Sequence, residues 1–142
     1  VAVSIGNFRV IKVEASELQA KSGLGVWRNV FDQLFDAHLG GSQDISREDI
    51  SNFMASNQLD VEFLPFLNSV LPFKVAESEL TGSLTAAALY SRTNWLLVDV
   101  VRAFLKKLNT MVLIIDDLQW CDSHSMGVLI EVAKLKGVFI VM

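Results

Sequence analysis

Cysteine is nearly absent from this sequence, and its scarcity limits what the protein can be. The single cysteine, Cys121, cannot form a disulfide within the chain and fits a reducing compartment. No apolar stretch approaches the roughly 20 residues that a membrane-spanning helix needs. The first ten residues also lack the charged and apolar segments of a signal peptide. We therefore expect a cytoplasmic protein that has no membrane partner.

Basic runs are missing as well. The chain has 12 Lys and Arg against 16 Asp and Glu, which gives a net charge of −4. No cluster of basic residues could track a phosphate backbone, so the sequence does not indicate nucleic acid as a partner. Hydrophobic residues make up 51% of the 142 residues, enough for the core of one domain or of a piece of a larger one. Because the chain begins without Met and stops inside the apolar run GVFIVM, we expect an internal fragment.

Hydrophobic spacing and helix signals divide the first two thirds of the chain into short elements. Segment 74–91 is ambiguous between loop and helix, and both prolines fall in 60–73, where any helix is short or broken. The other predictions are a strand at 8–13, a helix at 26–39, a short helix that starts at Ser46, and a helix at 93–108.

The last third carries the clearest pattern. Residues 111–115 form a continuous apolar run, which is typical of a strand covered on both faces in a parallel sheet. A helix over 123–135, with Asp122 or Ser123 as N-cap, and a strand over 138–141 follow it. This alternation predicts an α/β fold, a parallel sheet with helices on both faces.

Two adjacent carboxylates, Asp116 and Asp117, end the apolar run. Ligands bind outside the carboxyl ends of the strands in open parallel sheets. Like charges repel, and burial would raise their proton affinity unless a cation compensates. Magnesium takes such hard oxygen ligands, often together with nucleotide phosphates. The pattern thus predicts a Walker B motif. Asp116 and Asp117 would hold Mg²⁺, and Asp117 would be the catalytic residue that orients the attacking water. The competing interpretation is that both simply cap the next turn.

The stretch LIIDDLQWCDSHSMGVL resembles the ATPase domain of the STAND branch of AAA-related P-loop proteins. The matching positions are Asp116, Asp117, Leu118, Gln119, Trp120, Asp122 and Ser125. The resemblance implies a partial P-loop NTPase core over residues 1–142, with the Walker B strand to the following strand at 111–142. It further implies ATP and Mg²⁺ as cofactors and a role as a signalling switch. Its partners would be nucleotide, other domains of the same polypeptide and further copies of itself.

The resemblance extends upstream more weakly. NFRVIKVEAS is similar to the second strand of such domains, and LGVWRNVFDQLF to the start of the helix after it. The variant VWRNVF most resembles the ATPase-like region of soluble-type adenylate cyclases.

The sequence departs from this family in one respect: it contains no G-x-x-x-x-G-K-[ST] and no Gly-Lys pair. That loop supplies the backbone cradle and the lysine for the phosphates. We expect it to precede Val1, although a degenerate site is the other explanation. Two alternatives to the ATPase follow: an α/β scaffolding or interaction module without turnover, and a phospho-receiver domain. The receiver is disfavoured because its acidic pair follows an early strand, and a pair at 116 leaves too little chain.

Overall fold

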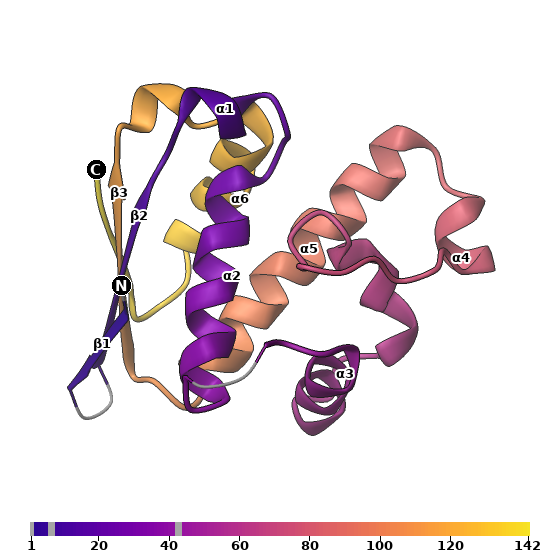
Figure 1. Ribbon diagram of the computed structural model, residues 1–142, viewed down its shortest axis with the longest axis horizontal. Helices are drawn as coiled ribbons and strands as arrows, with labels where there is room; N and C mark the ends of the chain where they lie inside the picture. Colours follow the sequence, from indigo (N-terminus) through magenta and orange to yellow (C-terminus); the bar gives the residue numbers. More distant parts are fainter. Residues whose placement is uncertain (1, 6–7, 42–43) are drawn as a thin grey trace.

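The computed structural model describes residues 2–5, 8–41 and 44–142, and its centre is a four-stranded sheet (Figure 1). The strand order is β1-β2-β3-β4, with β1 antiparallel to β2 and with β2, β3 and β4 mutually parallel. The strands are β1 (Ala2–Ile5), β2 (Phe8–Glu14), β3 (Thr110–Asp116) and β4 (Val138–Val141). The protein is therefore of the α/β class, with three parallel strands in its sheet.

Helices fill the long connection between β2 and β3 and the short one between β3 and β4. The first connection contains α1 (Glu17–Ala20), α2 (Gly25–His38), α3 (Arg47–Ser56), the 3₁₀ helix η1 (Val61–Leu67), α4 (Glu79–Gly82) and α5 (Ala86–Leu105). The second contains the 3₁₀ turn η2 (Leu118–Trp120) and α6 (Ser123–Ala133). In Figure 1, α2 and α6 lie beside the sheet, while α3 and α4 lie farther from it.

The core lies between the sheet and these helices. Alternate residues of β2 and β3 point toward the helices and are almost fully buried, namely Ile11, Val13, Met111, Leu113 and Ile115. The apolar stripe of α2 faces them, as its helical spacing predicts; its buried residues are Gly25, Val26, Trp27, Val30, Phe31, Leu34 and Phe35. The strand β3, which ends in the acidic pair, and its neighbour β2 are thus fixed by one continuous core.

The opposite face of the sheet differs from the prediction. Among the described residues, α2, α5 and α6 all lie on one side of the sheet (Figure 1). On the other side, Val112 and Ile114 are only half-buried, and Phe139 is 60% exposed. The prediction of helices on both faces is therefore not met in this part of the chain. A continuous apolar run does not distinguish a strand covered on both faces from one covered on a single face, which is why the prediction failed.

Most other elements were predicted correctly. The strand at 8–13, the helices at 26–39 and 123–135 and the strand at 138–141 correspond to β2, α2, α6 and β4. Ser46 starts α3 through a reciprocal capping box with Asp49, and η1 is the short helix expected around Pro65. However, α5 begins at Ala86, earlier than the expected residue 93, because Thr85 caps its largely exposed first turns.

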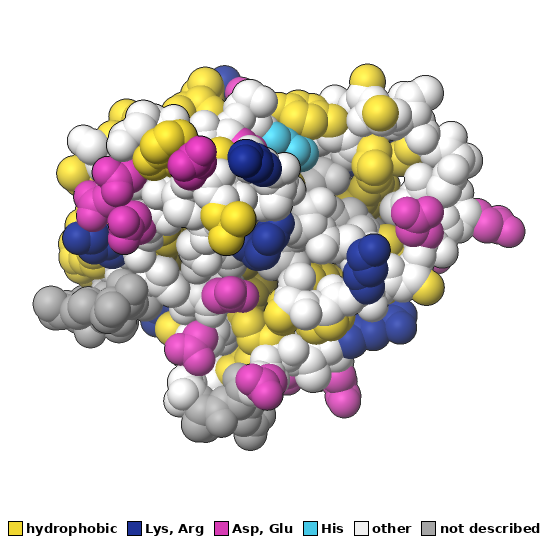
Figure 2. All heavy atoms as spheres, turned by 45° about the horizontal axis from the view of Figure 1, so that its top comes forward, with side chains coloured by type: hydrophobic (Ala, Val, Ile, Leu, Met, Phe, Trp, Pro, Cys, Tyr) yellow, Lys and Arg dark blue, Asp and Glu magenta, His cyan; other side chains and the backbone are white. Residues whose placement is uncertain are grey.

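The described residues contain no helix that is both long and apolar enough to cross a membrane. Charged side chains of both signs are scattered over the face drawn in Figure 2, without a broad basic patch.

Candidate functional site

The acidic pair sits at the carboxyl end of β3, which is flanked by the parallel strands β2 and β4. Asp116 is the last residue of β3, and its carbonyl accepts a hydrogen bond from the backbone N–H of Ala15 at 3.0 Å. Asp117 then adopts the left-handed conformation, with φ 56° and ψ 44°, and starts η2. Aspartate tolerates this conformation better than most residues do. The chain therefore turns sharply and leaves both side chains at the edge of the sheet.

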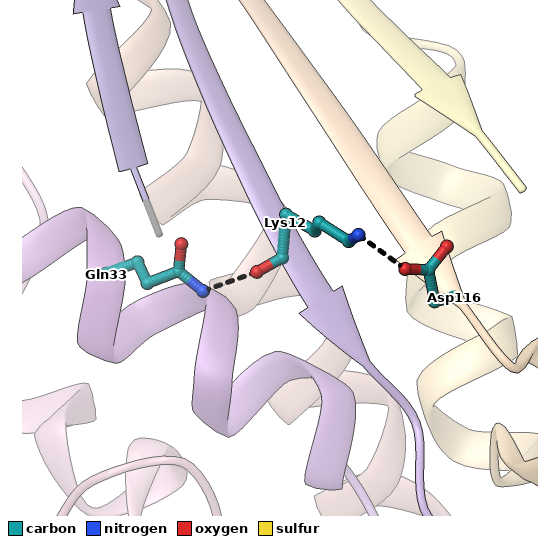
Figure 3. Close-up of polar contacts among 3 residues, drawn as sticks. All are labelled: Lys12, Gln33 and Asp116. Carbon is teal, nitrogen blue, oxygen red and sulfur yellow. Dashed lines mark hydrogen bonds and ion pairs between the residues drawn. The ribbon is translucent and has the colours of Figure 1, made fainter.

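Lys12 of β2 reaches across to Asp116. Its Nζ lies 2.8 Å from Oδ2 of Asp116 (Figure 3). The hydrogen bond and the charge of Asp116 raise the pKa of Lys12. Both side chains are about half exposed, at 58% and 49%, so solvent weakens the attraction between them. In this structure the cation beside the strand-end carboxylate is thus a lysine.

Among the described residues, the side chain of Asp117 has one weak hydrogen bond, which its Oδ1 accepts from Nε2 of Gln119 at 3.4 Å. Asp116 and Asp117 are both exposed. The sequence analysis expected burial to make a compensating cation necessary. Because both carboxylates are exposed, burial creates no such need. In the described part of the chain, no three His, Cys, Asp or Glu side chains converge as a ready-made metal site. What the pair offers is a set of accessible carboxylate oxygens at a sheet edge, suited to a hard cation whose other ligands are water or phosphate.

Asp122 is held far more firmly than the pair. Its Oδ1 accepts hydrogen bonds from the backbone N–H of Ser125 at 2.8 Å and from that of Leu24 at 3.1 Å. Its Oδ2 accepts the hydroxyl of Ser125 at 2.6 Å. Asp122 is thus the N-cap of α6. It also accepts the backbone N–H at the start of α2, where the N-cap residue, Leu24, has no side-chain oxygen.

A second bond reinforces this junction. The indole Nε1 of Trp27, which is fully buried in α2, donates to the carbonyl of Ser125 at 3.0 Å. Partial burial by itself would raise the pKa of Asp122, but the hydrogen bonds from Ser125 and Leu24 outweigh it, so the pKa lies below its usual value. Asp122 therefore stays ionised at neutral pH and fixes the loop that follows the acidic pair against the start of α2.

The sequence predicted which carboxylates lie at this edge but missed their neighbours. Lys12 could have been found by extending the parallel pairing of β2 and β3, since both its side chain and that of Asp116 point to the uncovered face. Nothing in the sequence indicates that Leu24 donates to Asp122, because the contact joins residues 98 apart through a backbone amide.

Comparisons with known proteins find no match for this chain among family profiles, curated proteins or solved structures.

Proposed function

We propose that this chain is part of an ATP-binding, Mg²⁺-dependent ATPase of the STAND type that acts as a cytoplasmic signalling switch, in a multidomain protein similar to soluble-type adenylate cyclases. Nucleotide state would then control attached domains. The proposal needs a phosphate-binding loop, which these 142 residues do not contain.

One observation carries the proposal: Asp116 and Asp117 leave the middle one of three parallel strands with their carboxylates accessible. Asp116 would take part in the magnesium shell, and Asp117, turned away by its left-handed backbone, would orient a water. Asp122 supports this arrangement because it anchors the loop that follows the pair. The junction keeps the loop in place, whereas the acidic pair is exposed to solvent, with Lys12 paired to one oxygen of Asp116.

Magnesium dependence tests the role of Asp116 in the complete polypeptide. We expect Asp116→Ala to weaken nucleotide binding in the presence of Mg²⁺, with far less effect in its absence, as measured by calorimetric titration. The matched variant is Lys12→Met, which removes the competing cation and should tighten Mg²⁺-dependent binding. Equal loss in Asp116→Ala with and without Mg²⁺ would indicate damaged folding and remove Asp116 from the metal shell.

Hydrolysis tests the role of Asp117. Removal of a general base typically costs 10²–10⁴-fold in rate. We expect Asp117→Asn in the complete polypeptide to preserve ATP binding and to lower the single-turnover hydrolysis rate by at least about tenfold. Asparagine also accepts the left-handed backbone of this position, so folding is not the cause. An unchanged rate would leave Asp117 as a turn residue only.

A scaffolding or interaction module without turnover is the second candidate. The Lys12–Asp116 ion pair favours it, because this pair already compensates the carboxylate that would otherwise hold magnesium. Under this alternative, Lys12→Met leaves nucleotide binding unchanged and Asp117→Asn has no catalytic consequence. The 142-residue chain alone should bind Mg-ATP weakly or not at all under either proposal, and micromolar affinity in calorimetry would contradict both.

A further inference from the structure

A cleft of about 340 Å³ lies away from the acidic pair, between the end of η1, the start of α4, the first half of α5 and the first turn of α6. This volume falls within the range of small-molecule sites in proteins. Residues from four separate elements line it, so its shape depends on the tertiary fold. Neither the acidic pair nor Asp122 lines it.

The inner wall of the cleft is built from buried side chains. Phe66 is 4% exposed, and the threonines Thr81 and Thr93 are 8% and 5% exposed. The hydroxyl of Thr93 donates to the carbonyl of Phe66 at 3.4 Å, which joins α5 to η1 at the base of the cleft. The wall thus combines apolar surface with hydroxyl groups whose positions are fixed.

The rim of the cleft is aromatic and acidic. Tyr90, 42% exposed, stacks on the ring of His124 with centroids 4.0 Å apart. Nε2 of His124 lies 2.6 Å from Oδ1 of Asn94, which fixes the ring. Glu77, an exposed residue, is the acidic residue among those that line the cleft, and no Lys or Arg occurs among the described lining residues. Burial also lowers the pKa of His124, which disfavours the charged form of the imidazole. The charge in the lining is therefore negative.

We propose that this cleft binds a small organic cation, a primary ammonium group attached to an apolar or aromatic body. The ammonium group would pair with the carboxylate of Glu77 and lie against the face of Tyr90, because aromatic faces attract cations. The apolar body would pack on Phe66 and Leu89. An anion would meet only like charge at the rim, and a neutral ligand would gain the apolar contacts alone. The proposal needs neither nucleotide nor magnesium, so it stands or fails independently of the ATPase.

A titration of the 142-residue chain with three matched probes tests the proposal in the absence of nucleotide and Mg²⁺. The probes are 2-phenylethylamine, 2-phenylethanol and 3-phenylpropionate, which share an aromatic body and differ in charge. We expect saturable amide shifts in NMR spectra around Glu77, Tyr90 and His124. The amine should bind about fivefold more tightly than the alcohol, the upper end of what one exposed ion pair contributes. The propionate should bind most weakly.

Two pairs of variants locate the site. Glu77→Gln should reduce the affinity for the amine to that for the alcohol, whereas Glu79→Gln, which changes a nearby carboxylate outside this cleft, should have no effect. Ala86→Leu should fill the cleft and weaken both probes by about tenfold or more, whereas Ala87→Leu changes an exposed neighbour that does not line it. The NMR spectra of the two leucine variants are compared with that of the wild type, and this comparison also shows whether the fold is intact.

Several outcomes would each overturn the proposal. These are no saturable shifts with 2-phenylethylamine, equal affinities for the amine and the alcohol, or an equal effect of Glu77→Gln and Glu79→Gln. Saturable shifts confined to other surfaces would place any cation site elsewhere and would also reject it.

Discussion

Two acidic positions of one loop differ sharply in how the protein holds them. Asp122 accepts three hydrogen bonds, from Ser125 and from Leu24, and joins two helices. Asp116 and Asp117, a few residues earlier, are exposed; Asp116 forms an ion pair with a lysine, and Asp117 accepts a weak hydrogen bond from a glutamine. The first carboxylate has its hydrogen-bonding capacity largely used by the fold. The other two retain theirs for water or a ligand.

This difference separates a carboxylate that the fold uses from two that it leaves exposed. A carboxylate that the fold requires is expected to be satisfied by protein donors, as Asp122 is. An exposed strand-end carboxylate in a left-handed turn, such as Asp117, contributes little to packing and stays available for chemistry. The comparison predicts large effects on stability at Asp122 and small effects at the acidic pair.

The largest effect is expected for Asp122→Ala. The change removes the N-cap of α6 and leaves the amide of Leu24 without its acceptor. A lost cap costs about 1 kcal/mol, and hydrogen bonds to a charged group contribute about 1.5–3 kcal/mol. We expect the free energy of unfolding to fall by about 3 kcal/mol in urea denaturation. Asp116→Ala is the control, and a loss of stability as large as that of Asp122→Ala would refute the comparison.

The dependence of stability on pH should also reveal the contribution of the Asp122 carboxylate, with a smaller effect than its removal. Hydrogen bonds hold the pKa of Asp122 below its ordinary value of 3.8, so the unfolded chain binds its proton first as pH falls. Its stabilising contribution is complete above that ordinary value and is lost as pH falls through the lower pKa of the folded state. Urea midpoints measured between about pH 3 and pH 6 should therefore fall more steeply in the wild type than in Asp122→Asn. Parallel profiles would show that the carboxylate is not stabilised in the fold.

At position 117, the effect of a substitution on stability should depend on the backbone conformation more than on side-chain hydrogen bonds. Because its φ is 56°, a β-branched side chain there would be strained, and Asp117→Val should cost about 1–2 kcal/mol. Asp117→Gly relieves that strain and should remain close to the wild type. Thermal unfolding of both variants checks this expectation. If the valine variant is as stable as the glycine variant, the turn does not hold the left-handed conformation.

The smallest effect is expected for Lys12→Met. Both side chains of the Lys12–Asp116 ion pair are exposed to solvent, and such pairs contribute little to stability. The midpoint of urea unfolding should stay within experimental error of the wild type, at low and at high salt. A marked loss of stability that is abolished by salt would show that the pair is structural, and this would weaken the distinction between the two acidic positions.

How far the sequence predicts the fold depends on whether a signal is local. Helices α2 and α6 and strand β4 were predicted because apolar spacing and caps lie within a few residues of each other. The start of α5 was missed because its first turns are largely exposed and carry no apolar stripe. The uncovered face of the sheet could not be predicted, since it depends on where distant helices pack.

The candidate site was likewise predictable where the signal is local and not where it depends on distant segments. The sequence places Asp116 and Asp117 at the end of a strand, because an apolar run followed by two acids is a local pattern. The partners of Asp116 and Asp122, Lys12 and Leu24, come from segments about 100 residues earlier. Lys12 can be placed beside Asp116 only once β2 is known to pair with β3, and the backbone donor Leu24 is a property of the folded chain that no spacing rule reveals.

The pairing of β2 with β3 also has a consequence for how the protein is made. These strands are hydrogen-bonded neighbours, and the nearby Trp27–Ser125 contact joins residues 98 apart. Contacts between distant segments slow folding, because a long loop must close before they form. At a synthesis rate of ~5–20 residues per second, β2 and the apolar stripe of α2 wait on the order of 5–20 s for β3 to be synthesised. During this interval the nascent chain exposes the surface that later becomes its core, so the protein should depend on chaperones more than its size suggests.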